Sequence, residues 1–125
     1  AALEVAVEFA RTEYNLLRHT PRYAQLASLL ADDARLVDAA RLACWRAAWM
    51  ADEGLPNAKE ASMAKLFASE MAERVCSDAI QVHGGYGYLA DFPVERIYRD
   101  VRVAQIYEGT SDIQRILIGR ALAAE

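Results

Sequence analysis

Apolar residues recur at spacings of three and four along most of this chain, and no strand-like alternation of apolar and polar residues persists anywhere. The clearest stripe lies within residues 21–53 and consists of Leu26, Leu30, Asp33, Val37, Ala40, Cys44 and Ala47. This spacing places the stripe on one face of a helix, interrupted by a single acid. A chain with only this period buries its apolar faces by packing helix on helix. The sequence therefore predicts an all-α fold.

Two early breaks set the limits of the first two helices. Residues 1–11 have a helical pattern without a preceding cap, which predicts a segment excised from a longer chain. Pro21 disfavours helix at the residue before it, so a turn separates this segment from residues 21–53. Gly54 and Pro56 end the second helix, because glycine suits a helix terminus and proline is a helix breaker.

A third helix is predicted from the residue after Asn57 to about residue 83. Asn57 is a common N-cap type, and Glu60 follows it at the spacing of a capping box. The apolar positions of this helix predict a buried face made of Met63, Phe67, Met71, Val75, Ala79 and Val82.

Two shorter helices complete the chain. Asp91 as N-cap and Pro93 in the first turn begin a helical stretch over about residues 94–106. After a break at residues 108–110, Thr110 caps a last helix over about residues 111–123. Three long and two short helices with brief connections predict one antiparallel domain, similar to a four-helix bundle, spanning residues 1–125.

The charge balance and the two cysteines argue against several classes of function. The formal net charge is −4 and the basic residues are not clustered, so neither nucleic acid nor an anionic membrane is a predicted partner. Cys44 and Cys76 each lie in a helical pattern, which predicts two small buried side chains rather than a disulfide or a metal site. Without a signal peptide or a long apolar run, the expected location is the cytoplasm or an organelle matrix.

The first of two candidate binding sites is a glycine break after the third helix. It consists of Gln81, Val82, His83, Gly84 and Gly85. Paired glycines leave the backbone open to a flat or phosphorylated ligand, although a simple glycine helix stop explains the same residues. His83 is predicted to be structural, since two histidines and two lone cysteines form neither a catalytic triad nor a metal-ligand pattern.

The second candidate site is the break before the last helix. It consists of Tyr107, Glu108, Gly109, Thr110, Ser111 and Asp112. Free N–H groups at a helix N-terminus attract anions such as pyrophosphate. The helix dipole would favour the ionised form of Glu108, whereas an apolar pocket around it would favour the neutral form. The alternative interpretation of Glu108 is a solvated loop acid.

Four segments, in order and at the family's spacing, resemble signatures of the acyl-CoA dehydrogenase C-terminal domain. They are EASMAKLFASE at residues 60–70, QVHGGYGY at 81–88, PVERIYRD at 93–100 and IYEGTSDIQR at 106–115. The resemblance covers about residues 35–123. It implies that this chain is the helical C-terminal bundle of a three-domain protein. The N-terminal helical domain and the middle β-domain of that protein would lie outside these 125 residues.

The resemblance also implies a reaction. The family binds FAD non-covalently and forms homo-oligomers, either dimers or tetramers. A base removes the α-proton of an acyl-CoA thioester, and the β-hydrogen leaves as hydride to the flavin, which gives the trans-2-enoyl-CoA. Electrons then pass to an electron-transfer flavoprotein, as in the β-oxidation of fatty acids.

Family roles carry over to matching positions. The resemblance makes Glu108 the base, aimed into a sheltered cavity near the double-glycine bend, and makes Tyr107 and Gly109 substrate contacts. It assigns FAD binding to Gln81, Val82, His83, Gly84, Gly85, Thr110, Ser111 and Asp112. Because the other two domains complete these sites, the isolated chain is expected not to turn over acyl-CoA.

One segment departs from the family pattern. Residues 13–17 stand where the family has Arg-x-x-Phe-Gly, and Tyr23 and Ala24 stand where it has Phe-Gln. The family's arginine and glutamine contact FAD across a subunit interface, whereas a carboxylate at Glu13 would repel pyrophosphate. Gln25 would replace the glutamine after a slip of one residue. This departure leaves a second function open, a non-catalytic oligomerisation or acyl-CoA-binding bundle derived from the family.

Overall fold

The computed structural model describes residues 1–14 and 21–124, and within these ranges it contains helices and no strands. The elements are α1 (Ala2–Glu13), α2 (Pro21–Asp52), α3 (Ala58–His83), η1 (Gly84–Tyr88), α4 (Pro93–Val101), η2 (Arg102–Gln105) and α5 (Ser111–Ala123), of which η1 and η2 are 3₁₀ helices. The all-α prediction is confirmed. None of the described helices combines the length and apolarity that a bilayer crossing requires.

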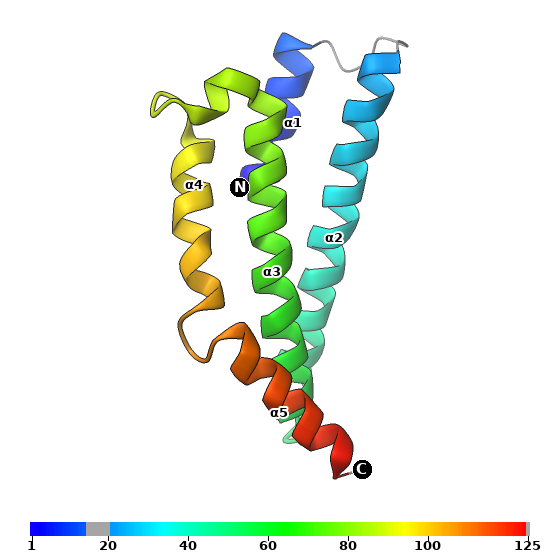
Figure 1. Cartoon of the computed structure of the whole chain (residues 1–125). Helices are drawn as coiled ribbons and strands as arrows, with labels where there is room; N and C mark the ends of the chain where they lie inside the picture. Colours follow the sequence, from blue (N-terminus) through cyan, green and yellow to red (C-terminus); the bar gives the residue numbers. More distant parts are fainter. Residues whose placement is uncertain (15–20, 125) are drawn as a thin grey trace.

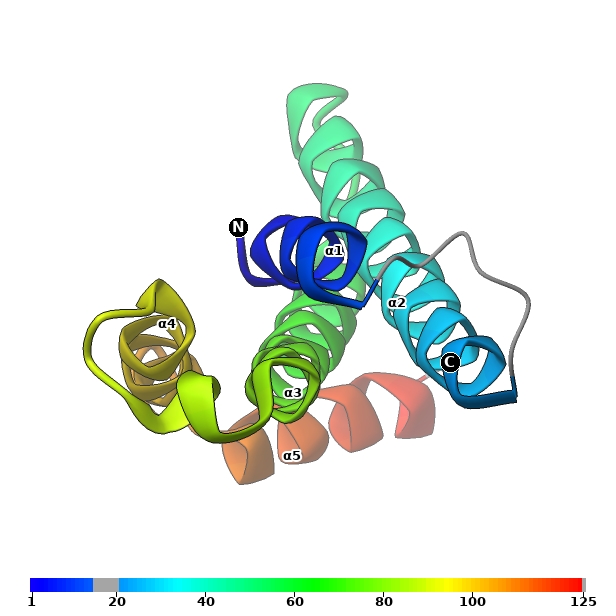
Figure 2. The ribbon, with the colours of Figure 1, turned by 90° about the horizontal axis from the view of Figure 1, so that it is seen from above.

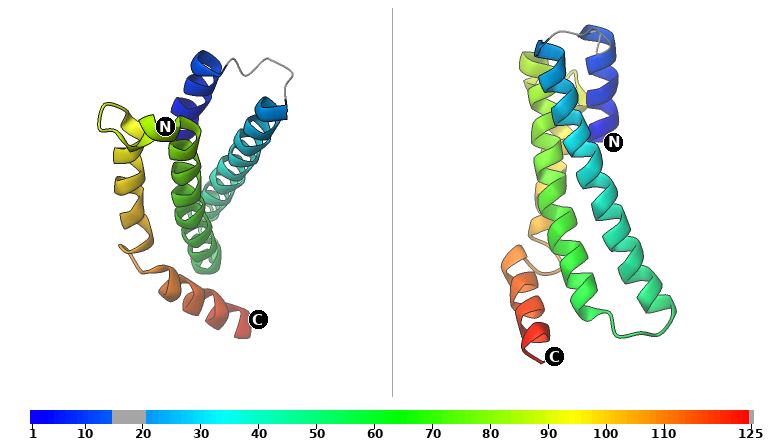
Figure 3. Two further views of the ribbon diagram at one scale, coloured as in Figure 1. Left: turned by 45° about the horizontal axis from the view of Figure 1, so that its top comes forward. Right: turned by 90° about the vertical axis from the view of Figure 1, so that its right-hand side faces the viewer.

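Helix α3 is the centre of the arrangement. Helices α1 to α4 run alternately up and down, and α5 crosses the lower end of the bundle (Figure 1). Seen from above, α3 lies between α4 and α2, with α1 on the remaining side (Figure 2). Helix α5 lies beside the first half of α3, beyond the end of α4 (Figure 3). Each of the other four α-helices contacts α3.

The main cluster of buried apolar residues lies towards the end of the bundle where α3 finishes. Ala2, Ala6 and Ala10 repeat at four-residue spacing and form the buried stripe of α1. Their small side chains let α1 pack closely against α3, where Cys76, Ala79 and Val82 are buried in the same cluster. This core supports the double-glycine bend from below.

Two predicted caps are wrong in detail. Asn57 is the N-cap residue of α3 but makes no side-chain cap hydrogen bond, because its Nδ2 donates to the carbonyl of Ala47 on α2 at 3.1 Å. Glu60 completes no capping box and instead pairs with Arg46 of α2 at 3.5 Å. Both side chains serve the turn that folds α3 back on α2. Phe92, not Asp91, is the N-cap residue of α4.

The buried face predicted for α3 is only half correct. Val75, Ala79 and Val82 are buried, but Met63 is 47% exposed and Phe67 is 38% exposed. Cys44 of α2 is also exposed, contrary to the prediction, whereas Cys76 is buried. These exposed positions lie beyond the core, where the described helices leave one side of the α2–α3 pair uncovered. Helical period identifies an apolar face without supplying the surface that covers it.

The single acid in the α2 stripe is buried between α2 and α3. Asp33 is 2% exposed, and its Oδ1 has no hydrogen-bond partner among the described residues. Burial, then the charge and hydrogen bond of Asp78 and the charge of Asp32, raise the pKa of Asp33 to about 6, with Arg74 opposing the shift. Burial and then Asp33 likewise raise the pKa of the neighbouring Cys76 thiol.

Replacing Asp33 by asparagine should stabilise the chain at neutral pH. The pKa of Asp33 is about 6 in the folded chain against 3.8 without the fold, so the stability contributed by its protonation is complete below about pH 4 and is lost as the pH rises through about 6. At about pH 7.5 the amide avoids a buried charge, and we expect a gain of about 1–2 kcal/mol. Thermal unfolding followed by circular dichroism, at about pH 4 and at about pH 7.5, measures this gain.

The matched control is Asp32→Asn, on the same turn of α2. The Asp32 side chain is 52% exposed and pairs with Arg35, so its loss should change the melting temperature little at either pH. An Asp33→Asn chain that is less stable than the wild type at neutral pH, or whose gain does not depend on pH, would contradict the prediction.

Candidate functional site

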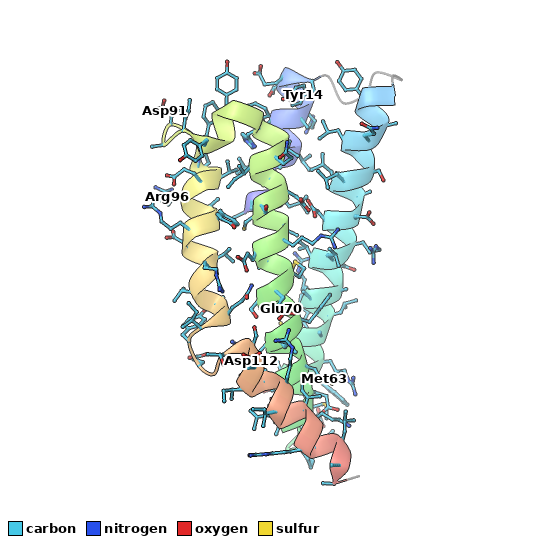
Figure 4. All side chains as sticks on the ribbon, viewed as in Figure 1. Tyr14, Met63, Glu70, Asp91, Arg96 and Asp112 are labelled. Carbon is cyan, nitrogen blue, oxygen red and sulfur yellow. The ribbon has the colours of Figure 1, made fainter. Side chains whose placement is uncertain are left out.

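The two candidate segments lie at opposite ends of α4. The double-glycine bend, residues 81–85, is at the upper end of α3, and residues 107–112, which lead from η2 into the first turn of α5, are at the lower end (Figure 1). Asp91, just after the bend, and Asp112, in the first turn of α5, mark these two ends (Figure 4). One copy of the chain therefore does not bring the two segments together.

The side chain of His83 is part of the core rather than of an open site. It is 2% exposed, and its ring stacks on Phe9 with ring centroids 4.1 Å apart. Its Nδ1 lies 2.7 Å from the carbonyl oxygen of Ala79. A carbonyl only accepts, so Nδ1 must carry the hydrogen and donate it. The predicted structural role of His83 is consistent with this geometry.

The glycines of the bend leave open space on the backbone. Gly84 has φ +59°, a conformation that favours glycine, and ends α3. A Cβ at Gly84 or Gly85 would meet no other atom within 4 Å. Gln81, just before them, is exposed, whereas Val82 is buried. The exposed backbone and the Gln81 amide form a surface that a flat or phosphorylated group can approach closely.

A hollow of about 300 Å³ lies beside this bend, between α2 and α3. Its lining includes Tyr14, Tyr23, Gln25, Leu26, Leu29, Gln81 and Val82. The departing segment of the sequence therefore meets the bend here, with Gln25 and Gln81 both facing the hollow. Residues 15–17 of that segment lie outside the described residues. Glu13 is exposed and, with Glu8, lines a second hollow of about 610 Å³ between α1 and the residues around the bend, which include His83, Tyr86 and Phe92.

The loop before α5 has an unusual backbone. Glu108 has φ +53° and Gly109 has φ +94°, so two consecutive residues are in the left-handed region. The φ of Gly109 favours glycine, and a Cβ there would also lie 2.8 Å from Nε2 of Gln114, which would have to move. Thr110 is the N-cap of α5, as predicted, and its Oγ1 accepts from the N–H of Ile113 at 3.4 Å. The loop thus delivers Glu108 directly before a helix N-terminus.

Two side chains outside the predicted site fix this loop. Lys65 of α3 donates from Nζ to the carbonyl of Gly109 at 2.6 Å. Gln114, buried in α5, donates from Nε2 to the carbonyls of Glu108 at 3.2 Å and Gly109 at 3.4 Å. Both residues lie within segments that carry the family resemblance, but no spacing rule links Lys65 to a loop 44 residues away.

The side chains of the loop face outward. Tyr107 and Glu108 are exposed, and so are their apolar neighbours Ile106 and Ile113. The sheltered cavity expected around Glu108 is therefore not formed by the described residues of this chain, which place no wall over the loop. Ser111 is half-buried, and Asp112 is exposed and pairs with Arg115 at 3.3 Å. Within residues 1–14 and 21–124 no three acidic, histidine or cysteine side chains are arranged to hold a metal ion.

Comparisons with known proteins agree with this architecture. The family described as "Acyl-CoA dehydrogenase, C-terminal domain" matches residues 1–123. An acyl-CoA dehydrogenase of Bacillus subtilis (strain 168) is 47% identical over 122 residues, covering 98% of this chain and 32% of that protein. The solved structure of butyryl-CoA dehydrogenase from Megasphaera elsdenii matches at 38% identity and a TM-score of 0.91, over 98% of this chain and 32% of that one.

A third comparison concerns a flavin complex. The structure of the FAD complex of PigA matches with 28% identity and a TM-score of 0.87, over 98% of this chain and 32% of that one. The chain spans about a third of the length of these relatives. The family match begins at residue 1, so the departing segment lies inside the family domain. The chain belongs to the acyl-CoA dehydrogenase family, in which it corresponds to the C-terminal helical domain.

Proposed function

We propose that this chain is the C-terminal domain of a flavin-dependent oxidoreductase that converts an acyl-CoA thioester into its trans-2-enoyl-CoA. On this proposal, an N-terminal helical domain and a middle β-domain would lie outside these 125 residues. The observation that carries the proposal is the loop before α5. There Glu108 is held at φ +53° by contacts to its own and the next carbonyl, immediately ahead of a capped helix N-terminus.

In this proposal Glu108 removes the α-proton of the substrate. A carboxylate acts as such a base when it is held in one direction and kept from water, because desolvation makes it more basic. The first condition is supported by the fixed loop backbone. The second requires a cover over exposed Ile106, Tyr107 and Ile113, which form an apolar border around Glu108. We assign that cover to the parts of the protein outside this chain.

The residues at the two ends of α4 fit FAD. Gly84 and Gly85 present open backbone, Gln81 presents an exposed amide, and residues 110–112 present the N–H groups of α5. Bound there, FAD supplies the acceptor for the hydride from the substrate β-carbon. Because one copy holds these segments at opposite ends, we propose that a flavin lies between the α5 end of one copy and the bend of another. A homo-oligomer, dimer or tetramer, is therefore part of the proposal.

The substrate and partners follow from the same assignment. Gly109 and Tyr107 would contact the thioester end of acyl-CoA, next to the base. An electron-transfer flavoprotein would reoxidise the flavin, and the reaction would belong to β-oxidation in the cytoplasm or, in a eukaryote, the mitochondrial matrix.

A second candidate function is a non-catalytic oligomerisation or acyl-CoA-binding bundle. The observation that favours it is the acidic edge formed by Glu8 and Glu13, of which Glu13 stands at the position of the family's arginine. Gln25 and Gln81, which face one hollow beside the bend, favour the flavin-binding function instead.

Flavin absorbance separates the two functions. The complete protein should be yellow when purified, and butyryl-, octanoyl- or palmitoyl-CoA should bleach the flavin band under anaerobic conditions. The 125-residue chain alone should neither retain flavin nor reduce a dye, because most of both sites lies outside it. A folded complete protein without flavin, to which added FAD does not bind, would contradict the proposal and favour the non-catalytic bundle.

A further inference from the structure

One contact that the proposed reaction leaves unexplained joins Lys65 to the loop of the base. Nζ of Lys65 and the carbonyl oxygen of Gly109 are 2.6 Å apart, a short bond with a charged donor, across 44 residues of sequence. The lysine lies in the first half of α3, and its side chain is half-buried. A partly buried lysine that donates a hydrogen bond to a backbone carbonyl fixes the orientation of that peptide group.

Gln114 fixes the same loop from the other side. It is 6% exposed, and its Nε2 donates to the carbonyl oxygens of both Glu108 and Gly109. The carbonyl of Gly109 thus receives a donor from α3 and another from α5. Two rigid helices therefore determine the orientation of two successive peptide groups.

The loop needs such support because its backbone is in an uncommon conformation. Glutamate rarely adopts a positive φ, and Glu108 has φ +53° next to Gly109 at φ +94°. Such a conformation persists only where surrounding contacts determine it. Without a donor on the Gly109 carbonyl, the loop gains freedom to rotate. The Glu108 carboxylate would then sample several directions, although its chemistry is unchanged.

We propose that Lys65 is a positioning residue for the reaction: through the Gly109 carbonyl it holds the backbone that aims Glu108 at the substrate α-carbon. This inference rests on the proposed function of Glu108. Lys65 acts through the loop and touches neither the reacting atoms nor the flavin. Displacing a reacting group by about 1 Å can cost about a hundredfold in rate.

The test uses the complete flavoprotein with Lys65 replaced by methionine, which keeps the length of the side chain but not the donor. Flavin reduction at saturating acyl-CoA, followed by rapid mixing, should be about tenfold to a hundredfold slower. Flavin content and the dissociation constant of acyl-CoA should stay close to wild type. With α-deuterated substrate the Lys65→Met enzyme should react more slowly still, with a larger isotope effect than wild type, because proton removal limits flavin reduction in the variant. Lys65→Arg, which retains a charged donor, should recover part of the rate.

The chain offers a matched control. Lys59→Met removes the other lysine, which lies earlier on the same helix, and should leave the reduction rate within about twofold of wild type. If the Lys65→Met protein cannot be purified with flavin bound, the reduction rates of Lys65→Arg and Lys65→Gln are compared instead. The Lys65→Gln enzyme is expected to be the slower of the two. Equal wild-type rates for that pair would overturn the inference.

Failure of this inference is distinct from failure of the proposed function. A Lys65→Met enzyme that reduces its flavin at the wild-type rate, while Glu108→Gln does not, overturns the positioning role alone. A rate loss that merely follows lost flavin, without a change in the isotope effect, also overturns it. A Glu108→Gln enzyme that keeps the wild-type rate overturns the proposed base, and the role of Lys65 with it.

Discussion

Replacing Glu108 by glutamine in the complete flavoprotein should slow flavin reduction by acyl-CoA about 10³-fold, within the range of roughly 10² to 10⁴ that general-base catalysis contributes. Glutamine keeps the size of the side chain but cannot take up the α-proton. The next acid along the chain, Asp112, is exposed and paired with Arg115, so it does not replace the base.

The substitution should leave the geometry of the loop intact. Lys65 and Gln114 bind the carbonyls of the loop rather than the Glu108 side chain. The loss should therefore appear in the reduction rate at saturation, while the dissociation constant of acyl-CoA and the flavin content change little.

Rapid mixing under anaerobic conditions measures that rate. Glu95→Gln is the matched control, since Glu95 pairs with Arg99 on the surface of α4, away from the loop. The control should react at the wild-type rate. If Glu108→Gln enzyme bleached its flavin as fast as the control, Glu108 would not be the base.

Among the substitutions considered for their effect on stability, Gly87→Ala should lower the free energy of unfolding most. Gly87 is buried in η1, where a Cβ would lie 2.5 Å from the carbonyl oxygen of Ile80 and 3.0 Å from Cβ of His83. Both obstacles belong to α3 and its core, so neither moves aside easily. We expect the free energy of unfolding to fall by about 2–4 kcal/mol and the melting temperature by about 10 °C.

Thermal unfolding of the purified chain tests this expectation. Gly85→Ala, two residues earlier, is the matched control, because a Cβ there meets nothing within 4 Å and its φ is not in the left-handed region. That variant should change stability by less than about 1 kcal/mol. If Gly87→Ala were as stable as Gly85→Ala, the close approach of η1 to α3 would not be a constraint on this fold.

Sequence periodicity was sufficient to predict the positions of the helices, but not which of their apolar side chains are buried. The limits of α2, α3 and α5 follow from Gly54, Gly84 and Thr110, whose backbone roles are local. The exposure of Met63 and Phe67 could not be predicted, because burial depends on a partner surface and not on the period of the helix itself. Tertiary surroundings decide that question.

The candidate site shows the same division. Its local parts, the bare glycine backbone and the helix cap at Thr110, could be predicted from residue types. The contacts that hold it, from Lys65 and Gln114, depend on how α3 meets the loop and α5. Asn57 illustrates the converse: its type predicts a cap, but a carbonyl of α2 lies closer to its amide. Long-range geometry overrides the local preference in each case.

Every other α-helix contacts α3, so α3 cannot unfold locally without losing its contacts with the other helices. Its backbone amides should be the slowest in the chain to exchange with solvent, because freeing them means giving up all four helix contacts together. Helix α5 packs mainly on α3, along a stripe that includes Gln114, Ile118 and Ala121, and most of its other positions are exposed (Figure 3). The amides of α5 should therefore exchange faster than those of α3, and the loop carrying Glu108 lies where the slowly and the more rapidly exchanging helices meet.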